Sequence, residues 1–368
     1  MFTKYIKCSF GLTILLMSAQ VLADPATDSS LSHRAVEAVK LLQQKYKPNE
    51  PGISYLIAHK GKVLASGGIG MANSEWNIAL SDTTLIRLGS MSKSVTAIAA
   101  LALVEQGKLA LDVPISTYAA ELPKHMGMVT MRQLLSHRSG IAEHAFDKEL
   151  IPFIWQPMTT KQIIELQKSK KTEFKPGEKY QYVNFNYVLV AHILEKITNK
   201  TFIDFANEDI FKSHQLTQSA YDQPTAVISN RAEFYNLKNG AILHAADVDL
   251  SHVSAAGALL SSVQDMGRWM NLITEGKLIS NKMLQEAWTA KPLTDGTVTK
   301  YGLGFNVSKF GDQKYIWHTG LTPGAQGAFA YTVDSEIFII ILSNLFYWPA
   351  DTGDLVDRMM EVMIDEKL

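Results

Sequence analysis

The spacing of hydrophobic residues near the start of the chain predicts a helix followed by a two-stranded hairpin. In residues 32–45, apolar side chains recur every three or four positions, which is the period of an amphipathic helix. Residues 52–58 and 63–68 are strand-like, and the turn-forming segment 59–62 lies between them. We therefore expect a hairpin directly after the first helix.

A second, very hydrophobic helix is predicted at residues 95–104, where nearly every side chain is apolar. A helix without a polar face is usually buried inside a fold. Its N-terminal side is the polar segment 88–93, so Ser90 should lie at or just inside the helix N-terminus. Lys93 follows three residues later and would share a helix face with Ser90.

The pattern changes between about residues 110 and 253, where helical segments are separated by loops rich in Pro, Gly, Asn and Asp. The helices predicted in this region span residues 130–136, 159–168, 187–198 and 202–211. Strand patterns return at residues 301–305, 315–318, 327–333 and 336–342, before a closing helix at 351–366. The apolar run 336–348 is interrupted by Ser343 and Asn344, so it favours a buried strand over a membrane span.

Strands near both ends of the chain predict an α/β (α+β) fold with one sheet built from both ends and helices packed on it. We expect residues 24–110 and 254–368 to form this sheet subdomain. Residues 111–253 would form an inserted, mostly helical subdomain, and a cleft would lie between the two parts.

The first 23 residues have the pattern of an export signal. Lys4 and Lys7 precede a short apolar core, and small residues precede a cleavage point after Ala23. The core is too short for a spanning helix, so we expect a periplasmic protein without stable membrane insertion, the alternative being an uncleaved anchor. The single cysteine, Cys8, lies in this segment, so the cleaved chain would have no disulfide and no thiolate metal site.

Charge excludes one large class of function. The formal net charge is −1, and removal of the two lysines of the signal would make it −3. A nucleic-acid-binding domain usually has a basic surface, so we expect no nucleic-acid partner. The substrate is expected to be a small molecule or a peptide, and the oligomeric state is left open.

Ser90 and Lys93 form the motif S-x-x-K, which can serve nucleophilic catalysis. A serine hydroxyl needs a base, and a desolvated lysine at the positive end of a helix can be one. The motif alone also occurs by chance, and Ser90 or Ser92 could simply cap the helix.

Two further motifs carry candidate chemistry. In Tyr182-Val183-Asn184, a tyrosine near a lysine could transfer a proton, and the asparagine amide could bind a substrate amide. The ordinary alternative is a half-buried loop aromatic followed by a turn residue. In the strand-end segment 318–320, His318 and Thr319 could project donors toward an extended substrate, and Gly320 would allow close approach. Its alternative is a strand end with a structural histidine.

In the order S-x-x-K, Y-x-N, H-T-G, these motifs resemble those of the serine penicillin-recognising enzymes. The branch that looks closest contains class C β-lactamases, serine D-Ala-D-Ala carboxypeptidases, D-aminopeptidases and related esterases. Further stretches that fit are LLSHRSGI at 134–141, PGEK at 176–179, AGAL at 256–259 with QDM at 264–266, YGLGF at 301–305 and LSN at 342–344. The resemblance covers nearly the whole chain after residue 23 and implies a β-lactamase/transpeptidase-like fold with an antiparallel sheet.

The resemblance also implies residue roles. Ser90 would be acylated, Lys93 would help to take its proton and Tyr182 would shuttle protons. The substrate-binding residues would be Asn184, His318, Thr319, Gly320 and Leu321. Among them, His318 stands where many relatives have a lysine that contacts the tyrosine and the substrate carboxylate, and the N–H groups of Ser90 and Leu321 would form the oxyanion hole.

The implied function is an exported serine hydrolase that acts through a Ser90 acyl-enzyme on amide, β-lactam or ester bonds, without metal or organic cofactor. Because a histidine is charged only part of the time near neutral pH, His318 weakens the case for a dedicated β-lactamase. A peptidase for D-amino acid peptides or a carboxylesterase is at least as consistent. A third hypothesis is a catalytically silent homologue that binds peptidoglycan or a protein.

Overall fold

The computed structural model describes residues 25–144, 148, 150–347, 349 and 351–365. The predicted signal segment and Cys8 lie outside the described residues. Within the described part of the chain, no helix is both long and apolar enough to cross a membrane.

The central element is a six-stranded sheet in the order β10-β11-β12-β13-β1-β2, in which every neighbouring pair is antiparallel. Its strands are β1 (Ile53–His59), β2 (Lys62–Ile69), β10 (Asn306–Phe310), β11 (Gln313–Thr322), β12 (Ala325–Thr332) and β13 (Ile337–Ser343). The N-terminal strand β1 pairs with the C-terminal strand β13, with Ile53 opposite Ser343. This confirms the predicted sheet built from both ends of the chain.

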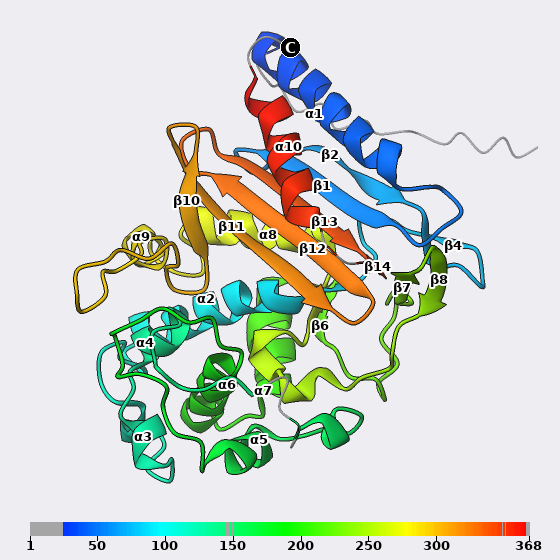
Figure 1. Cartoon of the computed structure of the whole chain (residues 1–368). Coiled ribbons are helices and arrows are strands. Elements are labelled where there is room, and N and C mark those ends of the chain that lie inside the picture. Colours follow the sequence, from blue (N-terminus) through cyan, green and yellow to red (C-terminus); the bar gives the residue numbers. More distant parts are fainter. Residues whose placement is uncertain (1–24, 145–147, 149, 348, 350, 366–368) are drawn as a thin grey trace, which may run out of the picture.

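Strand β13 shows why the sheet is covered on both faces. Its side chains alternate in direction, because successive residues of a strand point to opposite faces. Ile339 and Ile341 belong to a buried cluster with α1 (Pro25–Lys45) and α10 (Thr352–Ile364). Ile340 belongs to the larger cluster on the other face. Figure 1 shows α1 and α10 side by side on one face, and α8 and α2 on the other.

The remaining helices lie mostly on the α2 side of the sheet (Figure 1). They are α2 (Ser92–Glu105), α3 (Lys124–Gly127), α4 (Met131–Leu135), α5 (Thr160–Gln167), α6 (Phe185–Thr198), α7 (Phe202–Asp204), a π-helical turn (Phe205–Phe211), α8 (Val263–Thr274) and α9 (Asn281–Ala287). One buried cluster runs from sheet residues such as Phe329 through α2 to α6. The predicted subdomain boundaries stay predictions, since the hydrophobic packing is continuous across them.

The predicted helical region is only partly helical. After residue 214 the chain forms short strands: β6 (Ser219–Tyr221), β7 (Tyr235–Lys238) and β8 (Ala241–His244). Strands β7 and β8 pair across Asn239 and Gly240, which both have positive φ angles. Asn-Gly is a strong hairpin signal because both residues tolerate this conformation. The other short strands are β3 (Met71–Asn73), β4 (Ile78–Ala79), β5 (Ile86–Arg87), β9 (Leu259–Ser261) and β14 (Leu345–Phe346).

The strand predicted at residues 301–305 is wrong. Tyr301 forms only an isolated bridge with Asn306, where β10 begins. Between them the backbone turns, with the Gly302 N–H donating to the Phe305 carbonyl at 2.8 Å. Gly304 has φ +85°, and a Cβ on Gly302 would lie 2.1 Å from the Ala287 carbonyl oxygen. The glycines therefore allow a tight turn against neighbouring backbone, although the alternating aromatic pattern is typical of a strand.

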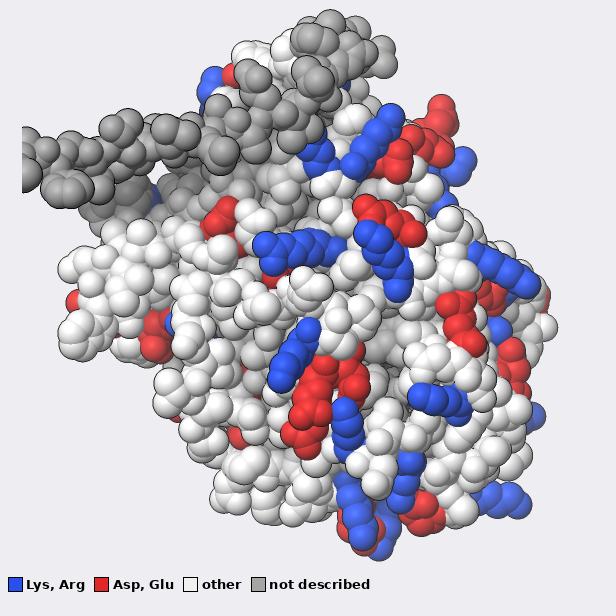
Figure 2. Space-filling model, turned by 180° about the vertical axis from the view of Figure 1, so that it is seen from behind, with Lys and Arg blue, Asp and Glu red and all other residues white. Residues whose placement is uncertain are grey.

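Charged side chains on the face seen in Figure 2 are mixed in sign. Lysines and arginines lie next to aspartates and glutamates, and no large area of one sign covers this face. This distribution agrees with the small net charge of the sequence. It offers no basic stripe of the kind that nucleic-acid-binding proteins use on this face.

Candidate active site

Ser90 lies in a 3₁₀ turn, Gly89–Met91, directly before the first turn of α2. It is half-buried, whereas the residues around it are buried. No side chain caps α2, and the Ser92 hydroxyl accepts a hydrogen bond from the Leu259 N–H at 3.2 Å instead. Ser90 is therefore placed where the sequence predicts it, and the capping alternative is wrong for both serines.

Two glycines let this turn lie directly against β11. Gly89 has φ +53°, and a Cβ there would lie 2.7 Å from the backbone nitrogen of Leu321. A Cβ on Gly320 would lie 1.9 Å from the Leu88 carbonyl oxygen. The backbone of β11 thus approaches the Ser90 turn closely, and the Leu321 amide lies next to the residue that precedes the nucleophile.

Lys93 is fully buried and directly contacts Ser90. Its Nζ lies 3.1 Å from Ser90 Oγ. It also lies 2.8 Å from Asn184 Oδ1 and 2.9 Å from the Ala256 carbonyl oxygen. Burial lowers the pKa of Lys93 to about 7, because the charged ammonium loses its hydration, while the nearby Glu143 carboxylate acts in the opposite direction.

These three contacts orient the neutral amine of Lys93. An amide oxygen and a backbone carbonyl can only accept hydrogen bonds, so Asn184 and Ala256 take the two N–H groups. The lone pair is then left for the third contact, the Ser90 hydroxyl. This is the arrangement that a general base needs in order to take the proton of the nucleophile.

Tyr182 lies over the same lysine. The centre of its ring is 4.7 Å from Lys93 Nζ, and its hydroxyl lies near Ser90. Desolvation of the phenol raises its pKa above the usual value, although 36% of the residue remains exposed. Tyr182 therefore stays protonated at neutral pH and reaches from Ser90 toward solvent.

His137 holds the segment that carries Tyr182. Its backbone carbonyl accepts from the Gln181 N–H at 3.0 Å, and its Nδ1 accepts from the Val183 N–H at 3.2 Å. Its ring centre lies 4.3 Å from that of Tyr182. Burial lowers the pKa of His137 well below its usual value, so the imidazole is neutral. His137 thus forms hydrogen bonds with the residues on both sides of Tyr182.

Asn184 is positioned by a carboxylate. Glu143 Oε2 accepts from the Asn184 backbone N–H at 2.6 Å and from its side-chain Nδ2 at 3.1 Å. The amide oxygen of Asn184 then faces Lys93. The predicted site thus includes one more residue, Glu143, whose carboxylate binds the NH₂ group of Asn184.

His318 lies beside the site but differs from its expected arrangement. Its Nε2 lies 2.9 Å from the Tyr301 hydroxyl, and its Nδ1 lies 2.6 Å from the Thr319 carbonyl oxygen. Since a carbonyl only accepts, Nδ1 carries the proton and Nε2 accepts from Tyr301. His318 is 2% exposed, and its ring centre is 6.3 Å from that of Tyr182.

Burial and the charge of Lys93 lower the pKa of His318 to about 3. It is therefore neutral at physiological pH, contrary to the expectation of a partial charge. Both ring nitrogens are already used, so this geometry gives no support to direct carboxylate binding by His318. Thr319 is half-buried and Leu321 is 41% exposed, so these two remain accessible along β11.

The structure thus brings Ser90, Lys93, Tyr182 and Asn184 together and lays the Gly320–Leu321 backbone against the serine turn. Sequence reasoning missed Glu143, and nothing in its neighbourhood singles it out. It also gave no role to His137 or Tyr301, although both lie in stretches that carry the family resemblance: LLSHRSGI and YGLGF.

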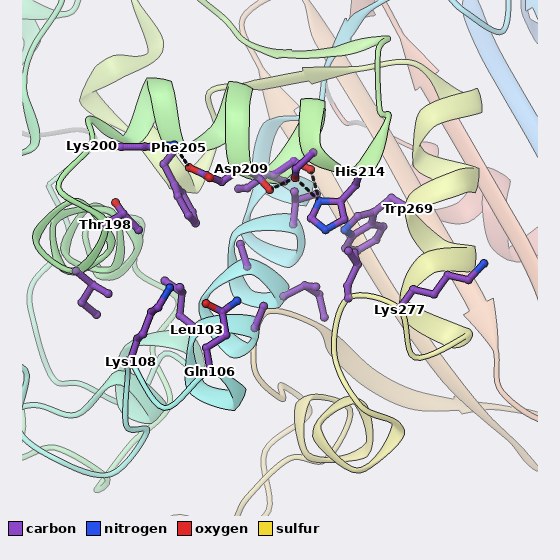
Figure 3. Close-up of a pocket in the computed structure, with 18 residues that line it drawn as sticks. Leu103, Gln106, Lys108, Thr198, Lys200, Phe205, Asp209, His214, Trp269 and Lys277 are labelled. Carbon is purple, nitrogen blue, oxygen red and sulfur yellow. Dashed lines mark hydrogen bonds and ion pairs between the residues drawn. The ribbon is translucent and has the colours of Figure 1, made fainter.

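A separate cavity lies along the body of α2. It has a volume of about 540 Å³, and the residues that line it do not include the predicted site residues. Figure 3 shows Leu103, Phe205 and Trp269 around it, with Lys108 and Lys200 at its border. Its position separates it from Ser90, which precedes the first turn of α2.

Sequence comparisons agree with the motifs. The profile of the family described as Beta-lactamase matches residues 38–363. The Bacillus subtilis protein PbpX, named as a penicillin-binding protein, is 28% identical over 290 residues, covering 79% of this chain and 70% of PbpX. The human mitochondrial serine beta-lactamase-like protein LACTB is 27% identical over 313 residues. That match covers 66% of this chain and 57% of LACTB, so the chain spans little more than half of this relative.

Solved structures share the fold. The octameric penicillin-binding protein homologue from Pyrococcus abyssi has a TM-score of 0.76 at 24% identity, over 91% of this chain and 77% of that chain. D-amino acid amidase from Ochrobactrum anthropi has a TM-score of 0.75 at 20% identity, over 93% of this chain and 100% of that chain. At these identities the likeness shows the architecture, whose antiparallel sheet and helices confirm the predicted fold class. The profile match over residues 38–363 shows that the chain belongs to the beta-lactamase family of serine hydrolase-type proteins.

Proposed function

We propose that this protein is an exported serine hydrolase that forms an acyl-enzyme on Ser90 with amide, β-lactam or ester substrates. The observation that carries the proposal is the contact between Ser90 Oγ and Lys93 Nζ at 3.1 Å, with Lys93 fully buried. A lysine whose pKa is about 7 exists partly as the free amine at neutral pH. It can therefore serve as the base that a serine nucleophile requires.

Acylation would begin with transfer of the Ser90 proton to the Lys93 amine. Ser90 Oγ attacks the substrate carbonyl, and the oxyanion forms next to the backbone N–H groups of Ser90 and Leu321. Donors held in place before the reaction stabilise such a charge, and loss of one typically costs about a hundredfold or more in rate. Tyr182 then donates its proton to the leaving nitrogen or oxygen and regains one from the Lys93 ammonium, so the serine proton ends on the leaving group.

Deacylation would reverse these transfers. Because the phenol of Tyr182 stays protonated near neutral pH, the free amine of Lys93 is the available base, and Tyr182 relays the proton of the attacking water to it. Water adds to the acyl carbon, the bond to Ser90 Oγ breaks, and the serine recovers its proton. Free acid and free enzyme are the products.

The substrate class follows from the neutral state of His318. A carboxylate anchor would need a cation or several donors at β11, and His318 is neutral and occupied by Tyr301 and Thr319. We therefore favour acyl donors that do not depend on a fixed cation, namely esters and amides, including amides of D-amino acids. The fold shared with D-amino acid amidase is consistent with this class.

The test is a comparison of acyl donors. Purified protein is incubated with a fluorescent penicillin, D-Ala-D-Ala peptides, D-aminoacyl amides and p-nitrophenyl esters, and Ser90→Ala is treated in the same way. We expect turnover of at least one class and a mass increase on the peptide that contains Ser90. Turnover that survives in Ser90→Ala would sink the mechanism. A protein that folds but neither turns over any substrate nor forms an adduct would support the silent, binding homologue.

Export is the second part of the proposal. It is supported by the basic, apolar and small-residue pattern of residues 1–23. Expression of the full chain in a Gram-negative host, followed by fractionation and N-terminal sequencing, tests it. We expect a periplasmic product that begins at Asp24. An uncleaved chain in the membrane fraction would instead support the anchor.

A further inference from the structure

A chain of hydrogen bonds connects Glu143 to the nucleophile. Glu143 Oε2 accepts from the side-chain amide of Asn184, and Asn184 Oδ1 accepts from Lys93. Lys93 in turn contacts Ser90. Asn184 and Lys93 stand between Glu143 and Ser90 in this series of hydrogen bonds, so we consider the effect of Glu143 on the reaction through these two residues.

We propose that Glu143 is a positioning residue of this site, which fixes the orientation of the Asn184 amide and sets the pH range in which Lys93 can take the Ser90 proton. The inference rests on the proposed function and adds a residue to its machinery. Two independent features of the geometry support it: the direction of the amide, and the negative charge placed behind the lysine.

The first feature is the direction of the amide. An asparagine side chain can present either its oxygen or its NH₂ group to a neighbour. Because a carboxylate only accepts, Glu143 holds the NH₂ group and leaves the oxygen for Lys93. If the amide were reversed, its N–H would compete for the lysine lone pair that should face Ser90. Glu143 thus keeps the base aligned with the nucleophile.

The second feature is charge. Lys93 is surrounded by the rings of Tyr182 and Tyr187 and lies near the neutral imidazoles of His137 and His318. None of these groups carries a negative charge at neutral pH. The Glu143 carboxylate is the group that favours the ammonium form and so opposes the effect of burial.

Glu143 is itself held in place by its neighbour. His144 is fully buried, and its Nε2, 2.7 Å from the His252 carbonyl oxygen, must donate to that carbonyl. A neutral ring then has no second N–H for Glu143 Oε1, which lies 3.1 Å from Nδ1. The His144 backbone N–H donates to Oε1 at 2.7 Å. The Lys170 ammonium lies 3.5 Å from the Glu143 backbone oxygen. The carboxylate is therefore bound from two sides and has a defined direction.

The test is the pH profile of acylation in Glu143→Gln and Glu143→Leu, measured with the ester or amide that the wild type turns over. Glutamine keeps an acceptor but removes the charge, so the acid limb should move to lower pH by about half a unit to one unit. Its plateau should fall less than about tenfold. Leucine removes the acceptor as well, and its plateau should fall about tenfold to a hundredfold, because the base loses its alignment.

Glu178→Gln is the matched control, since this partly exposed carboxylate bonds to the Lys175 segment and not to the site. Its profile should match the wild type. A Glu143→Gln profile with an unshifted acid limb, or a Glu143→Leu plateau equal to the wild type, would overturn the inference. If the wild type itself forms no acyl-enzyme, the proposed function fails first. In that case the shift is measured as the Nζ titration of Lys93 by NMR in wild type and Glu143→Gln, and equal titrations overturn the inference.

Discussion

The Tyr301 hydroxyl donates a hydrogen bond to His318 Nε2 at 2.9 Å and thereby holds the imidazole in its neutral form. The other ring nitrogen donates to the Thr319 carbonyl. A histidine on this strand could have supplied a pH-dependent positive charge to the cleft. Its two hydrogen bonds and its burial instead keep it neutral, and it stabilises β11.

The neutral state of His318 predicts a loss of stability in acid. Its pKa is about 3 in the folded chain and near the ordinary value of 6.5 in the unfolded chain. Between these values the unfolded state binds more protons, so the stabilisation is complete above about pH 6.5 and decreases as the pH falls. From pH 6.5 to 5 this one group should cost about 2 kcal/mol of unfolding free energy.

Urea unfolding of wild type and His318→Gln at pH 6.5 and pH 5 measures the contribution of His318 to the pH dependence of the unfolding free energy. The variant should lose less stability on acidification than the wild type, by about 2 kcal/mol. His33→Gln serves as the control because the His33 side chain is 64% exposed, and it should keep the full pH dependence. Parallel curves for His318→Gln and wild type would contradict a neutral His318.

Lys93 predicts the acid limb of the reaction. With a pKa of about 7, the lysine is mostly protonated below neutral pH and cannot take the serine proton. The acylation rate should therefore fall about tenfold for each pH unit below about 7 and level off above it. Stopped-flow acylation with a chromogenic ester, at constant ionic strength, gives the profile.

Substitution of the lysine checks the assignment. Lys93→Met should reduce acylation by about a hundredfold to ten-thousandfold, the usual range for loss of a general base. It should also unfold no more easily than wild type, since a buried methionine carries no desolvation cost. A flat pH profile in the wild type, or an acid limb that persists in Lys93→Met, would assign the base to another group.

The sequence predicts those parts of this site that depend on local patterns. S-x-x-K at the start of an apolar helix places Ser90 and Lys93 correctly, because one helical turn fixes their relation. The β7–β8 hairpin also had a readable signal in Asn239-Gly240, which the reading of a helical region overlooked. In both cases the determining residues are neighbours along the chain.

Glu143 and the turn after Tyr301 could not be predicted in this way. Glu143 reaches Asn184 only because the tertiary fold brings together positions 41 residues apart. The alternating Tyr301, Leu303 and Phe305 resemble a strand, but Gly302 lies against the Ala287 carbonyl and the backbone turns. Such contacts depend on partners that are distant in sequence, so no local pattern reveals them.

Gly89 lies close to β11. We therefore expect an alanine at position 89 to reduce the acylation rate more than an alanine that causes backbone strain alone. Gly89→Ala would place a Cβ 2.7 Å from the Leu321 nitrogen and push β11, which carries one N–H of the proposed oxyanion hole, away from Ser90. The left-handed conformation itself costs about 1–2 kcal/mol for a residue with a Cβ. We expect acylation to fall about a hundredfold or more, as for loss of an oxyanion-hole donor.

Gly311→Ala separates the two effects. Gly311 has φ +57°, close to the +53° of Gly89, but a Cβ there meets no atom within 4 Å. Gly311→Ala should lose about 1–2 kcal/mol of unfolding free energy to the same backbone strain. It should keep its activity. Equal acylation rates in the two alanine variants, measured on folded protein, would remove the oxyanion-hole argument.

His137 predicts a defect in deacylation. His137→Phe keeps an aromatic ring against Tyr182 but removes the Nδ1 acceptor of the Val183 N–H. A buried N–H without a partner costs about 1–3 kcal/mol, so the Tyr182 segment should shift to find another partner. In the proposed mechanism Tyr182 relays the proton of the attacking water, so the acyl-enzyme should persist about ten to a hundred times longer than in wild type.

Mass spectrometry of the Ser90 adduct over time measures its lifetime. His192→Phe is the control, because His192, on α6, is also buried but pairs with Glu121, away from Ser90. It should lower stability without lengthening the lifetime. If both variants prolong the adduct equally, general loosening of the fold explains the effect. If only His137→Phe does so, the imidazole affects deacylation by positioning the backbone on both sides of Tyr182.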